Sequence, residues 1–108
     1  MSNALQIVLC TVPDQETGDR IATTLVTEQL AACVNIIPGL TSIYKWEGER
    51  QTGTEVLLLI KTRSELYSQV ESRIAALHSY ELPEIISVPI ESGLTAYLDW
   101  IDNSTGKL

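Results

Sequence analysis

Residues 32–62 contain two long, largely apolar segments separated by a polar stretch. This pattern predicts two strands, over residues 33–46 and 54–62, with turn-forming residues 46–50 between them. The second strand contains five consecutive apolar residues, from Val56 to Ile60. Because alternate side chains of a strand point to opposite faces of its sheet, we expect a sheet that is apolar on both faces.

The remaining segments predict two further strands and three helices. Residues 5–11 and 85–90 are apolar and β-branched, which is typical of strands. Apolar residues at helical spacing predict helices over residues 15–31, 63–77 and 96–103. We expect Asp14, Thr62 and Thr95 to cap these helices. Glu65 stands at capping-box spacing from Thr62, which supports the second of these caps.

This order of elements predicts an α+β fold. A βαββαβ order with a short C-terminal helix is that of the ferredoxin-like split βαβ arrangement, an antiparallel four-stranded sheet with two helices on one face. Right-handed crossovers place the first and third strands in the centre. Pro89 cannot donate to a neighbouring strand, so the fourth strand is expected at an edge.

Length and charge limit the function classes. The 108 residues predict one domain, residues 1–108, and the formal net charge is −7. The seven basic residues form no stripe, which disfavours nucleic-acid binding and attraction to anionic membranes. No apolar run is long enough to span a membrane. Cys10 and Cys33 are too few for a disulfide scaffold, so we expect a reducing, cytoplasmic setting. Cys33 lies in an apolar segment, and we expect it to pack in the core.

The length of the first hairpin strand predicts self-assembly. Fourteen residues extend about 45 Å at ~3.3 Å each, whereas a compact domain of this size is only about 34 Å across. A protruding apolar hairpin with free edges aggregates unless a partner pairs with it, and a closed oligomer provides that partner. The alternative is that this strand breaks into two short ones at Pro38-Gly39, where we expect a bend.

Four stretches resemble one family: VLCTVPD, LAACVNIIPGLTSIYKWEGE, EVLLLIKT and LHSYELPEIISVPIESGLTAYLDWI. They are similar to the CutA family of divalent-cation tolerance proteins, over roughly residues 5–102. The resemblance implies a ferredoxin-like fold, a homotrimer, an architecture like that of the PII signalling proteins and an association with copper. It implies no enzymatic reaction. Ser79 stands where the family usually has proline, which loosens the segment that positions His78.

By resemblance, the candidate metal ligands are Cys10, His78 and Glu84. Thiolate with imidazole suits Cu(I), and imidazole with carboxylate suits Cu(II), although their spacing forms no metal-binding motif. We expect Cys10 and His78 at opposite ends of the sheet, so that they share a metal only across a subunit boundary. His78 and Glu84 are then the better pair within one chain. The structural alternatives are a buried thiol for Cys10, a helix C-terminal residue for His78 and a surface carboxylate for Glu84.

Two functions follow from this interpretation. The first is a trimeric cytoplasmic protein that binds copper or another divalent cation. The alternative is a PII-like regulatory or anchoring trimer that holds a small molecule or a protein partner in an inter-subunit cleft, lined by Tyr44, Lys45, Trp46, Lys61, Arg63 and Tyr80. The aromatic residues Tyr44, Trp46, Tyr80 and Trp100 suit trimer packing or a ligand cage. Catalysis is not expected, because no nucleophile is tied to His78 by a motif.

Overall fold

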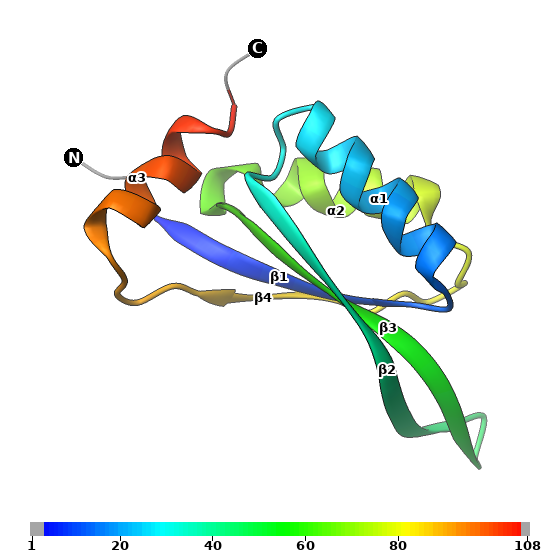
Figure 1. Ribbon diagram of the computed structural model, residues 1–108. Coiled ribbons are helices and arrows are strands. Elements are labelled where there is room, and N and C mark those ends of the chain that lie inside the picture. The colour runs from blue at the N-terminus through cyan, green and yellow to red at the C-terminus, as the bar shows by residue number, and fades with distance from the viewer. Residues whose placement is uncertain (1–3, 107–108) are drawn as a thin grey trace.

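The structure, a computed structural model, describes residues 4–106 and has two layers (Figure 1). The strands and helices in chain order are β1 Leu5–Val12, α1 Gln15–Thr27, β2 Cys33–Trp46, β3 Glu49–Arg63, the 3-10 turn η1 Ser64–Leu66, α2 Tyr67–Leu77, β4 Ile85–Pro89 and α3 Thr95–Asn103. The sheet order is β2-β3-β1-β4, with every neighbouring pair antiparallel. The predicted α+β ferredoxin-like fold is therefore confirmed, with β1 and β3 in the centre and Pro89 on an edge strand.

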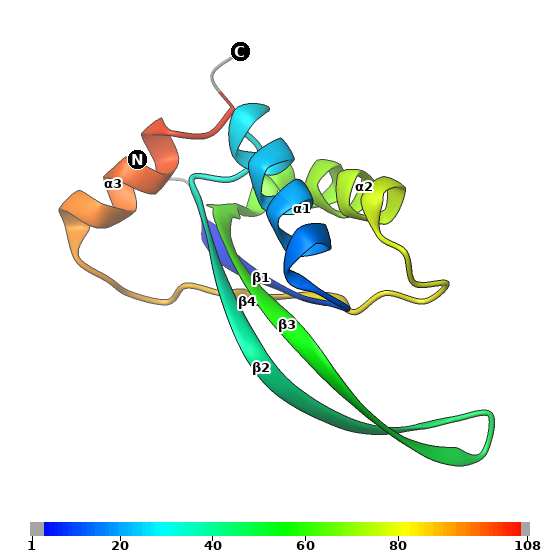
Figure 2. The ribbon, with the colours of Figure 1, turned by 45° about the vertical axis from the view of Figure 1, so that its right-hand side comes forward.

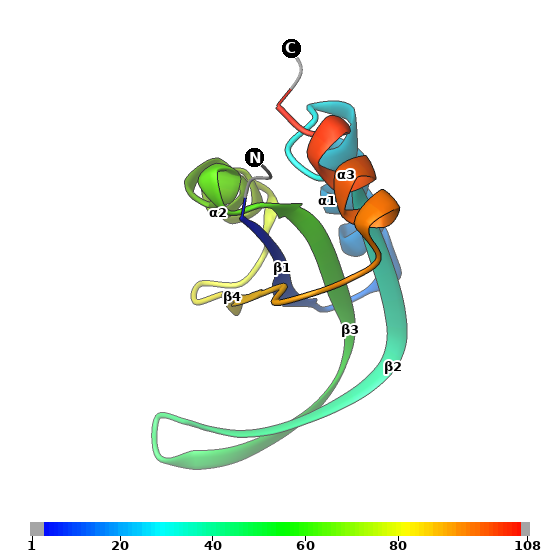
Figure 3. The same cartoon turned by 90° about the vertical axis from the view of Figure 1, so that its left-hand side faces the viewer.

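The core lies between the sheet and the two long helices, which cover one face (Figures 1 and 3). The register sets Val8 opposite Ile60 and Cys10 opposite Leu58, so these side chains share the helix-facing side. These positions and their helical partners are fully buried: Val8, Cys10, Leu58, Ile60, Ile21, Leu25, Val70 and Ile74. Each buried apolar side chain of this size contributes roughly 1.5–3 kcal/mol.

The β2–β3 hairpin extends well beyond the two-layer body. The molecule measures 48 × 26 × 22 Å along its principal axes, and the hairpin curves away from the helices (Figure 2). A bulge bends β2, because the pairing changes from Ile37 with Leu57 to Leu40 with Glu55. The strand continues through this bulge, so the predicted bend at Pro38-Gly39 is confirmed and the two-strand alternative is wrong.

The hairpin closes with a two-residue turn. Glu47 and Gly48 have φ angles of 52° and 83°, as a type I′ turn requires. This turn matches the natural twist of paired strands, and β3 therefore begins at Glu49, five residues earlier than the sequence pattern predicts. The longer strand brings polar residues near the tip into the paired structure.

The face of the sheet opposite the long helices is apolar and only partly covered. The register places Leu57, Leu59, Ile86 and Val88 on this face, and the last two are 51% and 42% exposed. Helix α3 packs across one end of the face, where Ile101 is fully buried. The prediction of apolar residues on both faces is confirmed, and the short last helix provides incomplete cover.

Two predicted helix caps are wrong, and one is confirmed. Thr62 remains in β3, where its hydroxyl donates to the Leu30 carbonyl oxygen at 2.6 Å, and α2 follows only after η1. Thr95 is already the first helical residue of α3. Asp14 does cap α1, accepting from the Thr17 N–H at 2.8 Å. Helix α1 ends at Thr27 rather than at residue 31. Within residues 4–106, no helix is long and apolar enough to cross a membrane.

Candidate functional site

The predicted metal ligands lie at one end of the sheet. His78 follows α2, and its Nε2 is 2.7 Å from the carbonyl oxygen of Thr11, the residue after Cys10. Ile85, which follows Glu84, pairs with Cys10 in the sheet. The expectation that Cys10 and His78 lie at opposite ends is therefore wrong. Strand β3 runs antiparallel to β1 and ends beside the start of β1, so α2 returns toward the end of β1 where Cys10 lies.

The His78 ring is held by two hydrogen bonds within the chain. A carbonyl oxygen only accepts, so Nε2 carries the proton and donates to Thr11. A backbone N–H only donates, so Nδ1 accepts from the N–H of Tyr80 at 3.1 Å. The neutral ring thus has one tautomer with both nitrogens occupied. In this arrangement His78 joins the end of β1 to the segment after α2 and offers no free lone pair to a metal.

Cys10 is a buried thiol rather than an exposed thiolate. Burial, together with the nearby charges of Glu84 and Glu55, raises the pKa of Cys10 to about 12. A protonated thiol is a poor metal ligand. Glu84 is exposed. Across residues 4–106, no three His, Cys, Asp or Glu side chains are grouped closely enough to hold a metal ion. The chain alone therefore presents Glu84 as the accessible member of the predicted set.

A hollow of about 880 Å³ opens beside these residues. The distal half of the hairpin curves beneath the sheet toward the segment that precedes β4 (Figure 3), and these two segments supply most of its walls. Its lining residues are Thr11, Ser42, Ile43, Tyr44, Trp46, Gln51, Glu55, Ser79, Tyr80, Glu81, Leu82 and Glu84. Three of the six residues predicted to line a cleft, Tyr44, Trp46 and Tyr80, are among them.

A hydrogen bond connects the two walls of the hollow. The Tyr80 hydroxyl donates to the Glu55 carboxylate at 2.7 Å. Burial and this hydrogen bond, together with the Glu55 charge, raise the pKa of Tyr80 well above its usual value. The Tyr80 ring also packs against the His78 ring, with centroids 4.6 Å apart. The His78 contacts and the Tyr80–Glu55 bond therefore link β1, β3 and the segment after α2 into one wall.

Two carboxylates of the hollow, Glu55 and Glu81, were not predicted as site residues. The pairing of Tyr44 with Gln51 and of Leu40 with Glu55 puts alternate residues of the distal hairpin on one face. Alternation along β3 could have placed Glu55 on the same face as Gln51. Nothing in the sequence indicated Glu81, because the irregular segment before β4 has no periodicity to read.

The three basic residues predicted for the cleft lie elsewhere in the chain. Lys45 pairs with Arg50, on the hairpin face opposite Tyr44. Lys61 lies at the other end of the sheet, where it donates to the Tyr97 hydroxyl at 3.1 Å and lines a smaller cavity of about 360 Å³ beneath α3. One chain therefore does not bring these cations to the hollow.

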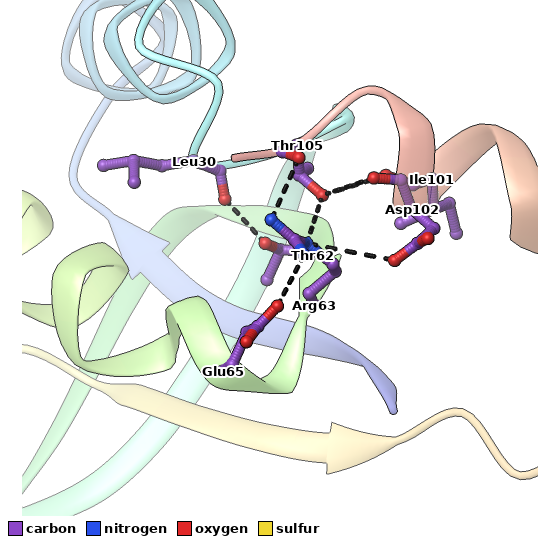
Figure 4. Close-up of polar contacts among 7 residues, drawn as sticks. All are labelled: Leu30, Thr62, Arg63, Glu65, Ile101, Asp102 and Thr105. Atoms are coloured by element: carbon purple, nitrogen blue, oxygen red, sulfur yellow. Dashed lines mark hydrogen bonds and ion pairs between the residues drawn. The ribbon is translucent and has the colours of Figure 1, made fainter. Parts of the chain in front are cut away.

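Arg63 has a structural role at the same distant end of the sheet. Its guanidinium donates to the hydroxyl and carbonyl oxygens of Thr105 at 3.0 Å each and forms ion pairs with Glu65 and Asp102 (Figure 4). These contacts hold the segment after α3 against the end of β3. In this chain Arg63 is used in docking the last helix.

Comparison with known proteins assigns the family. A model of the family described as CutA1 divalent ion tolerance protein matches residues 6–104. The chain belongs to the CutA1 family. It is 50% identical over 101 residues to the divalent-cation tolerance protein CutA of Thermus thermophilus, covering 94% of this chain and 98% of that relative. It is 48% identical to the chloroplastic CutA 1 protein of Oryza sativa, covering 92% of this chain but only 56% of that relative.

Solved CutA1 structures agree with the fold. The protein from Thermus thermophilus matches with a TM-score of 0.93 at 50% identity, over 94% of this chain and 99% of that one. CutA1 from Oryza sativa matches with a TM-score of 0.95 at 45% identity, over 99% of this chain and 98% of that one. The resemblance seen in the sequence is thus confirmed over nearly the whole chain. The family name supports a relation to divalent-cation tolerance.

Proposed function

We propose that this CutA1 chain forms a cytoplasmic homotrimer that contributes to tolerance of copper or another divalent cation by binding it. The observation that carries the proposal is the hollow at the end of β1, to which Glu55, Glu81 and Glu84 contribute carboxylates. Among residues 4–106, no lysine or arginine lines it. Such a surface attracts cations. The family name gives the class of ion, since it refers to divalent ions.

The ligand chemistry favours a carboxylate-led site. Glu84 is exposed and needs no rearrangement to bind a cation. For sites of nitrogen and oxygen ligands, Cu²⁺ has the highest affinity among the first-row divalent ions, so copper is expected to compete well here. Cys10 and His78 would join such a site only if the thiol lost its proton and a ring nitrogen gave up its hydrogen bond to Tyr80 or to Thr11. We therefore assign the first contact with the ion to Glu84.

Calorimetric titration with Cu²⁺ tests this assignment. Glu84→Gln should weaken binding several-fold, while Glu91→Gln, which removes the same charge outside the lining of the hollow, should leave the affinity within twofold of the wild type. Equal copper affinities for all three proteins would refute Glu84 as a ligand. A parallel titration with Mg²⁺ separates copper preference from general attraction to negative charge.

The trimer is proposed from the exposed faces and edges of the sheet. Strands β2 and β4 are both edges, and the hairpin extends beyond the body of the molecule. Apolar side chains such as Ile86 and Val88 are exposed on the sheet face. Pairing of edges between three copies would satisfy the free backbone groups of both edge strands and bury this face in a closed ring.

Light scattering after size-exclusion chromatography tests the assembly. Val88→Lys places a charge on the exposed sheet face and should lower the measured mass from three chains toward one. Val26→Lys is the matched control, because Val26 on α1 is 44% exposed and Val88 is 42% exposed. A wild-type protein of one-chain mass across the micromolar range would refute the trimer. Equal masses for the two variants would refute this face as the interface.

A regulatory or anchoring role remains the second candidate. A hollow of about 880 Å³ lies within the range of pockets that hold small molecules. In a trimer, this hollow would adjoin the free edges of the hairpin and so the boundary between subunits. A thermal-shift screen of metabolites would support this role if one compound raised the melting temperature where copper did not. We expect no catalysis, since the His78 ring nitrogens are both used in holding the fold.

A further inference from the structure

Helix α3 carries a stripe of exposed apolar side chains. Leu94, Tyr97 and Trp100 follow one another at intervals of three residues, which places them along one side of the helix. They are 76%, 40% and 45% exposed, and the rings of Tyr97 and Trp100 pack together with centroids 5.5 Å apart. A contiguous group of large apolar side chains at the surface is typical of a site that another molecule covers.

A positive charge lies beside this stripe. Lys61 donates to the Tyr97 hydroxyl at 3.1 Å, and its ammonium nitrogen is 5.4 Å from the centre of the Tyr97 ring. An ammonium group has three N–H donors, so Lys61 can also donate to a carboxylate of another chain. Asp99 is two residues from Tyr97 and therefore points to the other side of α3. We call Leu94, Tyr97, Trp100 and Lys61 the α3 surface.

The hollow described above has the complementary character. Tyr44, Trp46 and Tyr80 contribute aromatic rings to its lining, and the first two side chains are 50% and 41% exposed. The same lining contains three carboxylates. Aromatic rings pack favourably against other rings, and an ammonium group forms charge-assisted hydrogen bonds with carboxylates. The hollow therefore matches the α3 surface in both its apolar and its charged parts.

The two surfaces cannot meet within one chain. The hollow adjoins the end of β1, whereas Lys61 pairs with Ile7 near the start of β1, where α3 lies (Figure 1). The eight residues of β1 span about 26 Å at ~3.3 Å each. Two different, complementary surfaces at opposite ends of one chain are what a head-to-tail contact between copies requires, and such contacts close into a ring when the rotation between copies allows it.

We propose that the α3 surface of one copy packs into the hollow of the next copy. This inference rests on the trimer proposed above, and it names the two surfaces that meet. The stripe of α3 would cover Tyr44 and Trp46, and Lys61 of the partner subunit would face the carboxylates of the hollow. Three carboxylates against one ammonium group leave negative charge in excess, so the boundary between subunits would still attract a cation. The residues predicted for an inter-subunit cleft would then come from two copies.

Mixing two variants tests the contact. Tyr44→Glu places a charge in the hollow, and Trp100→Glu places one on the α3 surface. Light scattering after chromatography should give the mass of one chain for each variant alone. In an equimolar mixture, the intact hollow of the Trp100→Glu chain can accept the intact α3 surface of the Tyr44→Glu chain, so we expect the mass of two chains. Circular dichroism establishes that each variant is folded, and Trp46→Glu and Leu94→Glu serve as the second pair.

Reversing the charge of Lys61 tests the polar part of the contact. Lys61→Glu sets a carboxylate against the carboxylates of the hollow and should raise the concentration at which the assembly dissociates at least about tenfold. Arg20→Glu is the matched control, because it makes the same charge change at an exposed position on α1. Its dissociation concentration should stay within about threefold of the wild type.

The outcomes separate this contact from the trimer itself. A wild-type protein with the mass of one chain would refute the trimer and, with it, this contact. A wild type of three chains whose Tyr44→Glu and Trp100→Glu variants also keep three chains would overturn the contact and leave the trimer standing. Folded single-chain variants that do not combine when mixed would also overturn it, since the two surfaces would then not meet each other. Equal effects of Lys61→Glu and Arg20→Glu would overturn the pairing of Lys61 with the hollow.

Discussion

Replacing His78 by alanine should destabilise the protein through two lost hydrogen bonds. The ring donates to the Thr11 carbonyl oxygen at 2.7 Å and accepts from the Tyr80 N–H at 3.1 Å. Each bond of this kind contributes about 0.5–1.5 kcal/mol net, so the expected loss is about 1–3 kcal/mol in the free energy of unfolding. The segment after α2 also loses its hydrogen bond to β1, so the wall of the hollow should become more mobile.

Equilibrium unfolding in urea measures this effect. With a denaturant slope of about 1–3 kcal/mol per molar urea, a loss of about 2 kcal/mol moves the midpoint by roughly 1 M. The protomer concentration must be held constant, because the stability of an oligomer depends on it. Ser79→Ala is the neighbouring control: this side chain is exposed, and its removal should shift the midpoint by much less.

One result would refute the structural role of His78. If His78→Ala kept the wild-type midpoint and tryptophan fluorescence but lost copper binding, the ring would be a metal ligand rather than a structural connector. If it lost stability and kept copper binding, the ring would be a connector between β1 and the segment after α2. The two measurements together separate a binding role from a structural one.

Three further predictions follow from buried and capping groups. Burial raises the pKa of Cys10 to about 12, so a thiol reagent at pH 8 should label the partly exposed Cys33 first and Cys10 only after denaturation. Peptide mass spectrometry would show the order of labelling, and equal labelling of the two cysteines would contradict the burial of Cys10. Thr62→Val keeps the side-chain volume but removes the donor to the Leu30 carbonyl oxygen. Urea unfolding should therefore show a loss of about 1–3 kcal/mol in the free energy of unfolding. An unchanged midpoint would mean that water replaces the hydroxyl. The Thr17 N–H holds the pKa of Asp14 below its usual value of about 4. The cap should therefore stabilise the protein above that pH and lose its effect as the pH falls through the lower folded value. Melting temperatures of Asp14→Asn, which caps without titrating, should fall less below pH 4 than those of the wild type, and parallel curves would contradict this.

Sequence patterns predicted the features that depend on interactions between residues close together in the chain. The strand periodicity, the polar turn and the bend at Pro38-Gly39 all appear in the structure, because steric limits on a few adjacent residues decide them. The Asp14 cap is of the same kind, since its bond spans three residues. The Thr62 cap failed because the Leu30 carbonyl oxygen, 32 residues away, competes for the same hydroxyl. A sequence window around Thr62 contains no sign of that competitor.

The candidate site was predicted only in part, for a related reason. Tyr44 and Trp46 were expected near Tyr80, and the three do line one hollow. The basic residues grouped with them are separated by strand register or by the length of the sheet. Lys45 is one position from Tyr44 and therefore on the other face. Lys61 lies at the opposite end of β3, where it contacts α3.

The order of elements and the long apolar hairpin could be predicted from the sequence, because propensity, turn chemistry and alternation are properties of neighbouring residues. The family could be recognised from the resemblance of four stretches of the chain. The contacts at the end of β1 depend on how the distant parts of the chain pack together. This packing brings His78 against Thr11, buries the Cys10 thiol and joins Tyr80 to Glu55. These contacts connect residues 25 to 67 positions apart, and chain direction and register decide such contacts when the helices fold back onto the sheet.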